Sequence, residues 1–120
     1  MGLKAGLNPD ILYEVMSSGG ASSDQLASRG RDMLAGNYAT KSSIWVATKD
    51  TDLSLELGKR LGVVLPVGAL FHQFYLNARH RGWDQKDATI VMRIFEELAN
   101  FKRESRRSSS KPMPFKKGSK

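Results

Sequence analysis

Residues 52–62, Asp-Leu-Ser-Leu-Glu-Leu-Gly-Lys-Arg-Leu-Gly, decide the fold that we expect for this 120-residue chain. Three of their leucines recur at i, i+4 and i+8, which is the period of an α-helix with one apolar face. The acidic residues precede the basic ones, an order that suits both the helix dipole and the pairing of residues four apart. Gly62 supplies a stop, so the stretch predicts the C-terminal part of a helix.

The residues just before this stretch leave two interpretations open. Apolar and polar residues partly alternate over residues 44–48, which allows a short strand. We prefer one helix between residues 41 and 61, because the downstream period is helical.

Cap residues and prolines mark four further helices. Asn8, Pro9 and Asp10 provide a cap, a proline at the first helical position and an acid in the first turn. Gly30, in the interior of the next helix, weakens that prediction. We expect helices from Pro9 to about Ser17, from Ser22 or Ser23 to about Leu34, from Pro66 to about His80, and from a cap at Asp84, with Asp87 as its capping-box partner, to about Leu98.

Length and pattern together predict an all-α protein with a single domain of about five helices. The chain is 40% hydrophobic and has no cysteine, which excludes disulfides and cysteine-rich zinc sites and fits a cytoplasmic protein. The longest apolar run, residues 62–71, is interrupted by Pro66 and is too short to span a membrane. We therefore expect no membrane association.

The formal net charge of +7 belongs to the C-terminal end of the chain. Residues 1–101 hold 11 basic and 11 acidic residues, whereas residues 102–120 hold eight basic residues and one acid. We expect a helical domain over 1–101 and a disordered basic tail over 102–120. The tail offers one aromatic, Phe115, so we expect at most weak binding to nucleic acid.

Common catalytic and cofactor motifs are absent from the sequence. Gly19-Gly20 lacks the further spaced glycines of a dinucleotide fingerprint, and there is neither a P-loop nor a nucleophile elbow. His72 and His80 lie eight residues apart on one expected helix, too far for an i, i+4 metal pair, so we predict no metal site.

Lys49-Asp50 is the pair with the most suggestive surroundings. It follows the apolar residues 44–47, and a lysine and a carboxylate beside a partly buried region are costly unless they are paired or used. Spacing alone favours the simpler alternative, a surface pair on an exposed helix face.

Five segments of the chain, taken in order, carry a resemblance to a known family. They are Lys4-Ala-Gly-Leu-Asn-Pro-Asp10 with Leu12, Glu14 and Val15; Ser28-Arg-Gly with Met33-Leu-Ala-Gly-Asn-Tyr38; Lys49-Asp50 with Leu53, Leu55, Glu56 and Leu57; Leu61-Gly62 with Leu65-Pro66; and Gly82 with Asp84, Asp87 and Ala88. Over residues 2–98 the chain resembles the C-terminal helical domain of the 3-hydroxyisobutyrate dehydrogenase (β-hydroxyacid dehydrogenase) family. That family includes 2-hydroxy-3-oxopropionate reductases and glyoxylate or succinic semialdehyde reductases, and is related to 6-phosphogluconate dehydrogenase.

The resemblance implies a role in an NAD- or NADP-dependent oxidoreductase acting on a small 3-hydroxyacid or semialdehyde. Lys49 matches the lysine that reaches the bound dinucleotide near the nicotinamide, and Asp50 matches the carboxylate that organises the substrate pocket. Ser42 stands where the family often has a phenylalanine that shapes this pocket. The family's Rossmann domain and catalytic lysine have no counterpart here, so we expect a fragment that is inactive until another chain or domain supplies them.

A non-enzymatic role is the alternative hypothesis. A helical domain whose apolar faces lack their usual cover is expected to self-associate, with a homodimer as the simplest form, while the basic tail binds an anionic partner. Phe71, Phe74 and Tyr75 are candidates for such contacts, although core packing is the expected use of at least two of them.

Overall fold

The structure, a computed structural model, describes residues 1–103 of the chain. These residues form five α-helices and one short 3-10 helix and contain no strand, which confirms the all-α prediction. The elements are α1 (Pro9–Ser18), α2 (Asp24–Ala35), α3 (Ile44–Leu61), α4 (Pro66–His80), η1 (Ala88–Val91) and α5 (Met92–Leu98). Most of the predicted disordered tail, residues 104–120, lies outside the described residues.

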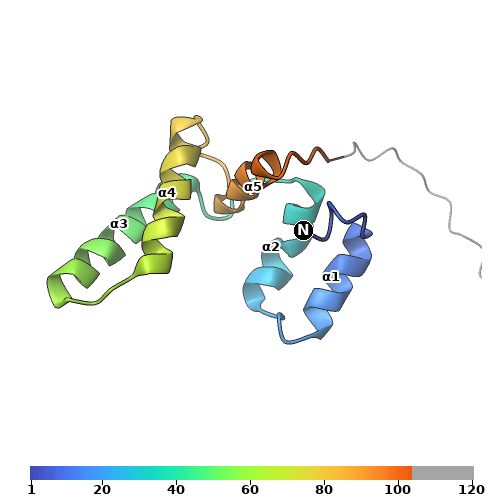
Figure 1. The fold of residues 1–120 in the computed structure, drawn as a ribbon, viewed down its shortest axis with the longest axis horizontal. Helices are drawn as coiled ribbons and strands as arrows, with labels where there is room; N and C mark the ends of the chain where they lie inside the picture. Colours follow the sequence, from blue (N-terminus) through green and yellow to red (C-terminus); the bar gives the residue numbers. More distant parts are fainter. Residues whose placement is uncertain (104–120) are drawn as a thin grey trace, which may run out of the picture.

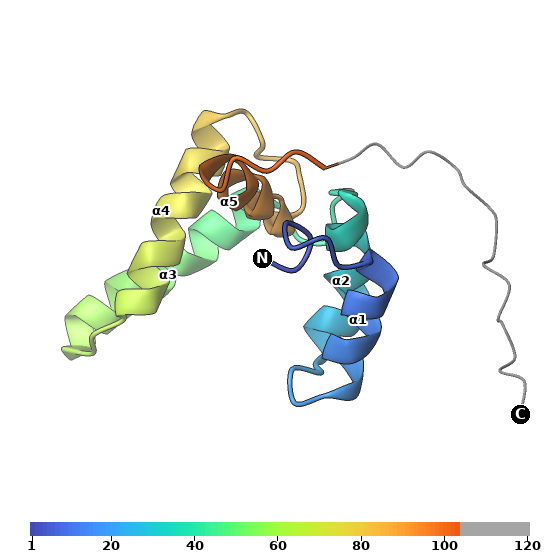
Figure 2. The ribbon, with the colours of Figure 1, turned by 45° about the vertical axis from the view of Figure 1, so that its right-hand side comes forward.

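Two helix pairs and a connecting group make up the molecule (Figure 1). α1 packs on α2, and α3 packs on α4, while η1 touches α4, α5 and α2. Figures 1 and 2 both place α5 between the two pairs. The elements η1 and α5 therefore join the two helix pairs.

Local capping signals set the helix ends. Asn8, Ser23 and Ser43 each accept hydrogen bonds at their side-chain oxygen from backbone amides in the first turns of α1, α2 and α3. Gly36 and Gly62 end α2 and α3 in the left-handed conformation, with φ of 73° and 71°. Of the two serines considered for α2, Ser23 is the cap. The strand interpretation of residues 44–48 is wrong, because they form the start of α3.

The predicted start of the last helix is also wrong. Asp84 does not cap a helix, and its carboxylate instead binds Arg79, with 2.7 Å between Oδ1 and Nε. The backbone carbonyls of Asp84 and Lys86 accept hydrogen bonds from the amides of Trp45 and Ile44. The carbonyls of this segment accept from amides in the first turn of α3, so the segment itself is not helical. Helical structure begins only after Asp87, which caps η1.

The fully buried apolar core of the described residues is small. It consists of Ile44, Ala78, Ile90 and Ile94, where the start of α3, the end of α4, η1 and α5 meet. Phe74 and Tyr75 pack partly buried against this core, as predicted for two of the three aromatics on α4, whereas Phe71 is 39% exposed. With so few buried side chains, polar contacts must contribute much of the order.

A buried histidine joins α3 to α4. His72 lies with Nδ1 3.0 Å from Oγ1 of Thr51 and with Nε2 3.1 Å from Oδ1 of Asp52. The described residues contain no group of three side chains that could hold a metal ion. Through its contacts with Thr51 and Asp52, His72 of α4 packs on α3.

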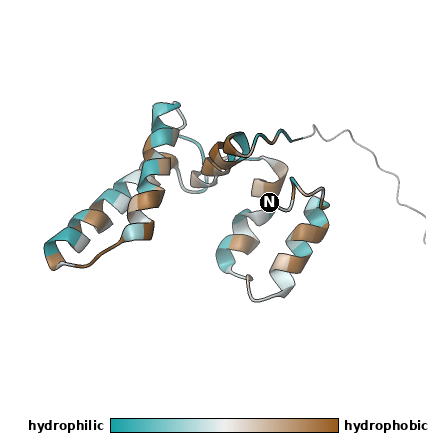
Figure 3. Ribbon diagram, in the orientation of Figure 1, coloured by the Kyte–Doolittle hydropathy of each residue, from teal (hydrophilic) through white to brown (hydrophobic). Residues whose placement is uncertain are grey.

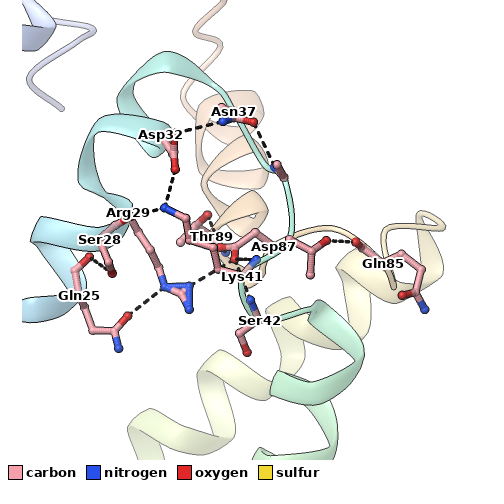
Figure 4. A network of polar contacts seen from close by, with 12 residues as sticks. Gln25, Ser28, Arg29, Asp32, Asn37, Lys41, Ser42, Gln85, Asp87 and Thr89 are labelled. Atoms are coloured by element: carbon pink, nitrogen blue, oxygen red, sulfur yellow. Dashed lines mark hydrogen bonds and ion pairs between the residues drawn. The ribbon is translucent and has the colours of Figure 1, made fainter.

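The Asp87 carboxylate is the centre of a polar network (Figure 4). Its Oδ2 accepts from the amides of Lys41 and Ser42 at 2.9 and 3.1 Å and lies 3.3 Å from Nη1 of Arg29. Its Oδ1 accepts from the amide and the hydroxyl of Thr89 at 3.1 and 2.7 Å. One buried side chain, 3% exposed, thus joins α2, the segment before α3 and η1.

Arg103, which we place in the predicted tail, also joins two helices of the domain. The guanidinium of Arg103 donates to the backbone carbonyls of Met33 and Leu34 at the end of α2, each at 2.7 Å. It also pairs with Glu96 of α5, with 2.6 Å between Nη2 and Oε1. Arg103 thus packs against the helices of the domain.

The contact between α1 and α2 depends on Gly30. A Cβ at this position would lie 2.8 Å from Cδ1 of Leu26 and 3.0 Å from Cε2 of Tyr13. We expect Gly30→Ala to lower the free energy of unfolding by about 1–3 kcal/mol through overpacking, although alanine is the better helix former. Urea unfolding measures this, with Ser28→Ala on the exposed side of α2 as the control. A stabilised Gly30→Ala variant would contradict the packing.

Asp87→Asn is expected to lower the free energy of unfolding at pH 7 by about 3 kcal/mol. The amide has one oxygen, so either the Lys41 and Ser42 amides or the Thr89 groups would face an NH2 instead of an acceptor. Urea unfolding is the measurement, and Glu14→Gln, which removes a carboxylate with no ion pair among residues 1–103, is the control. Equal stability of the two variants would argue against the network.

The same carboxylate should make stability depend on pH. Burial alone would raise the pKa of Asp87, but the hydrogen bonds from Thr89, Ser42 and Lys41 outweigh it and lower this pKa from 3.8 to about 2. A pKa lowered by folding stabilises the native state above the unfolded pKa, here by roughly 2 kcal/mol, and this contribution is lost as the pH falls from about 5 towards 2. The stability difference between wild type and Asp87→Asn should therefore shrink over that range. A difference independent of pH would contradict this.

Candidate functional site

The predicted site residues lie at the beginning of α3. Ser42 precedes the helix, Ser43 caps it, and Lys49 and Asp50 follow in its second turn. The Asp87 network holds this start in place, because it binds the backbone of Lys41 and Ser42 (Figure 4).

Lys49 and Asp50 form an exposed ion pair. Their Nζ and Oδ1 atoms are 3.1 Å apart, and their side chains are 50% and 60% exposed. The Lys49 ammonium also lies 6.0 Å from the ring centroid of Trp45, one turn earlier on the same face, which is the outer limit of a cation–π contact. Within residues 1–103 the pair therefore has the surface arrangement that spacing favoured.

Ser42 lies at a different place from this pair. Its amide donates to Asp87, its carbonyl accepts from Ala88 at 2.8 Å, and its side chain borders a cavity of about 570 Å³. Lys49 and Asp50 do not border this cavity. The structure thus does not bring the three predicted residues into one pocket.

The cavity beside Ser42 is mainly an apolar surface. Arg29 and Thr89 provide polar atoms at its edge, but both are already bound to Asp87. Tyr75 and Phe95 line its wall, and burial raises the pKa of Tyr75, whose hydroxyl stays neutral. Because the charge of Arg29 is neutralised, apolar side chains fit this surface better than an anion does.

A second apolar cavity adjoins the first. It has a volume of about 390 Å³, and it shares Met33, Met92 and Phe95 with the first cavity. Met1 and Met16 also line it, so four of the five methionines of the chain lie along this cavity. Methionine side chains adapt to irregular apolar contacts, so the two cavities form one adaptable apolar surface.

The described residues fit a dinucleotide cofactor only in part. The sequence has no glycine-rich fingerprint, and residues 1–103 contain no strand from which a Rossmann turn could start. Lys49 offers an exposed cation that suits a phosphate or carbonyl oxygen. The chain can therefore contribute one contact to a nucleotide held by other residues.

None of the helices in this part of the chain is long and apolar enough to cross a membrane.

Sequence reasoning missed the residues that position the site. The sequence predicts Asp87 only as the capping-box partner of Asp84, and the contact of Asp87 with Arg29 joins residues 58 positions apart. A local signal did exist in Asp87-Ala-Thr89, because an aspartate two residues before a threonine favours such a capping turn. Trp45, beside Lys49, carried no signal that distinguished it from a core aromatic.

Comparison with known proteins assigns the family. Residues 1–95 match the family model described as NAD-binding of NADP-dependent 3-hydroxyisobutyrate dehydrogenase. The chain is 30% identical over 95 residues to L-threonate dehydrogenase of Cupriavidus necator, and 29% identical over 99 residues to 2-(hydroxymethyl)glutarate dehydrogenase of Eubacterium barkeri. These matches cover 79% and 82% of this chain but 32% and 33% of the relatives, so the chain spans about one third of their length.

A solved structure confirms the fold. The crystal structure of 3-hydroxyisobutyrate dehydrogenase from Salmonella typhimurium superimposes with a TM-score of 0.72 at 24% identity, over 78% of this chain and 33% of that one. At this identity the likeness concerns the fold alone. The family model, by contrast, covers most of the chain, including α3 with Lys49 and Asp50. The chain therefore belongs to the family of the NAD-binding helical domain of 3-hydroxyisobutyrate dehydrogenases.

Proposed function

We propose that this domain contributes Lys49 and Asp50 to the active site of an NAD- or NADP-dependent 3-hydroxyacid dehydrogenase or semialdehyde reductase. The nucleotide-binding part of that enzyme would be supplied by residues beyond these 120, on the same or another polypeptide. The observation that carries the proposal is the exposed Lys49–Asp50 pair on the helix that the family model covers.

The chemistry of the pair supports this role. The bound nicotinamide would supply hydride transfer, and Lys49 would orient an oxygen of the cofactor or substrate through a charge-assisted hydrogen bond. Asp50, 3.1 Å away, would hold the ammonium in place. A helix with a buried inner face gives both groups a rigid base, which matters because small displacements of orienting groups cost much of the rate.

By the resemblance, Ser42 stands where the family often has a phenylalanine that shapes the substrate pocket, and we propose that it borders this pocket in the complete enzyme. Within residues 1–103 the cavity beside Ser42 suits apolar side chains, so further residues would have to supply the surface that holds the anionic substrate. We expect the small serine side chain to leave a wider pocket than a phenylalanine would. Kinship with 6-phosphogluconate dehydrogenase and a cytoplasmic location remain predictions of the sequence.

The chain alone is proposed to be inactive. Hydride transfer needs a held cofactor and a group that exchanges a proton with the substrate hydroxyl. Lys49 is already paired with Asp50, and neither residue borders either of the two cavities described above. The adjoining apolar cavities support a domain that works against a further protein surface.

Self-association is a second candidate role, favoured by the amount of exposed apolar surface. Leucines on α3 and valines between α3 and α4 are among the large apolar residues that face solvent, for example Leu61 at 68% and Val64 at 89% exposed. Such patches commonly mark protein interfaces. Leu61 and Val64 lie at and beyond the other end of α3 from Lys49 and Asp50, so contacts made there are compatible with the enzymatic role.

A chimera tests the role of Lys49. Residues 1–103 would replace the corresponding third of L-threonate dehydrogenase from Cupriavidus necator, and NAD(P)H absorbance would report turnover of L-threonate. We expect activity, and a fall in kcat/KM of about 100-fold or more for Lys49→Ala, because an orienting cation near the reacting atoms is lost.

Lys86→Ala is the control for that variant, since this lysine is exposed and its side chain forms no ion pair within residues 1–103. It should leave kcat/KM unchanged. A chimera that is folded by circular dichroism but does not turn over, or one in which Lys49→Ala keeps full activity, would contradict the proposal.

A further inference from the structure

We propose that Trp45 is a cofactor-contacting residue of the Lys49–Asp50 site, and that its indole provides the surface against which the nicotinamide ring of a bound dinucleotide lies. The inference rests on the proposed function, in which Lys49 orients an oxygen of the cofactor or substrate. Neither the spacing of the sequence nor the resemblance of the chain to its family identifies Trp45 as a site residue.

The two tryptophans of the chain have opposite surroundings. Trp83 packs partly buried against the core, and the guanidinium groups of Arg81 and Arg93 lie 5.1 and 5.7 Å from its ring centroid. Trp45 is not among the residues packed against this core, and it is 48% exposed. Tryptophan is enriched where a large ring is buried on binding, so an indole left in solvent beside a candidate site indicates a contact surface.

The beginning of α3 holds Trp45 in place. The backbone amides of Ile44 and Trp45 donate to the carbonyls of Lys86 and Asp84 at 2.9 and 3.1 Å, and Ser43 caps the helix. Ile44 is fully buried, so the first turn is fixed against the core. Figure 3 shows hydrophilic as well as hydrophobic turns along α3, as expected for a helix with one side in solvent. The exposed indole therefore starts from a rigid backbone.

Trp45 and Lys49 lie on the same face of α3, because they are four residues apart. The Lys49 ammonium is 6.0 Å from the centroid of the Trp45 ring, and its Nζ is 3.1 Å from Oδ1 of Asp50. The face thus offers a flat apolar surface next to a hydrogen-bond donor. A planar ring that carries an oxygen acceptor matches both features.

The charges on this face select the ring over the phosphates of a dinucleotide. Lys49 and Asp50 neutralise each other, so the pair has no net charge to attract a pyrophosphate, and the Asp50 carboxylate would repel one. The carboxamide of nicotinamide is neutral, and its oxygen can accept from Lys49. The oxidised ring is cationic, and an indole face favours a cation. Because Lys49 is proposed to act near the reacting atoms, the nicotinamide end fits this face better than the adenine end.

Titration calorimetry with NAD+ tests the contact. The protein is a chimera that carries the full 120-residue chain in place of the corresponding third of L-threonate dehydrogenase from Cupriavidus necator. Trp45→Ala should raise the dissociation constant of NAD+ by about 10-fold, the size expected when an aromatic contact with a nucleotide ring is lost. Trp45→Phe keeps an aromatic ring and should stay close to wild type. Ile11→Ala, at a position 58% exposed on α1, is the control and should change nothing.

ADP-ribose identifies the end of the dinucleotide that Trp45 contacts. This ligand contains the adenine and the phosphates of NAD+ but no nicotinamide. Trp45→Ala should therefore leave the dissociation constant of ADP-ribose unchanged. Circular dichroism verifies that all variants are folded.

Tryptophan fluorescence gives a readout that a purely structural role would not change. NAD+ absorbs little of the tryptophan emission, so it quenches an indole mainly by direct contact. NAD+ should quench the wild-type chimera more strongly than the Trp45→Phe variant. ADP-ribose should quench the two equally.

Three results would overturn the proposal. They are a Trp45→Ala variant that binds NAD+ like wild type, equal quenching by NAD+ in wild type and Trp45→Phe, and a loss of affinity for ADP-ribose as large as that for NAD+. The proposed function fails separately, if Lys49→Ala keeps full kcat/KM. Normal NAD+ affinity of Trp45→Ala in an enzyme that needs Lys49 would contradict the Trp45 contact alone, and a folded chimera that binds no NAD+ would contradict both.

Discussion

The buried carboxylate of Asp87 is the contact on which the arrangement of this domain depends. The described part of the chain has only four buried apolar residues, so hydrophobic packing needs support from polar contacts. Asp87 receives hydrogen bonds from the segment before α3 and from η1, and it pairs with Arg29 on α2. Because the start of α3 is fixed in this way, the side chains that follow along the helix, including Lys49 and Asp50, have defined directions.

Because few apolar side chains are buried, much of the apolar surface of the domain is exposed. Two adjoining apolar cavities lie between the α1–α2 pair and the rest, and the outer face of α3 carries leucines in solvent. The chain spans about one third of its curated relatives, and its family model describes an NAD-binding domain of a larger dehydrogenase. Exposed apolar faces of this kind commonly mark protein interfaces.

Local signals made most of the helices predictable. Asn8, Ser23, Ser43 and Gly62 act on neighbouring backbone groups, so the bounds of α1, α2 and α3 follow from short-range chemistry. Contacts between distant segments were invisible in the sequence. The sequence predicts Asp84 as a cap, because nothing in the neighbouring residues indicates that its carbonyl accepts a hydrogen bond from the amide of Trp45.

The candidate site likewise combines features that local sequence signals predict with features that depend on contacts between distant segments. Gly30 weakens the prediction of α2, and the close approach of Leu26 and Tyr13, which leaves no room for a Cβ, explains why a glycine is there. Lys49 and Asp50 were identified by resemblance to a family, since their spacing alone indicated an ordinary surface pair. The groups that they would serve lie outside the described residues, so their role has to be measured in the presence of those groups.

Reconstitution from two separate chains tests the central claim most directly. The 120-residue chain would be titrated into a separately expressed nucleotide-binding half of Cupriavidus necator L-threonate dehydrogenase, with NAD(P)H absorbance as the readout and the intact enzyme as the positive control. Our account predicts turnover that rises with added chain and saturates near one chain per nucleotide-binding half. No turnover at any ratio, with the intact enzyme active, would contradict it.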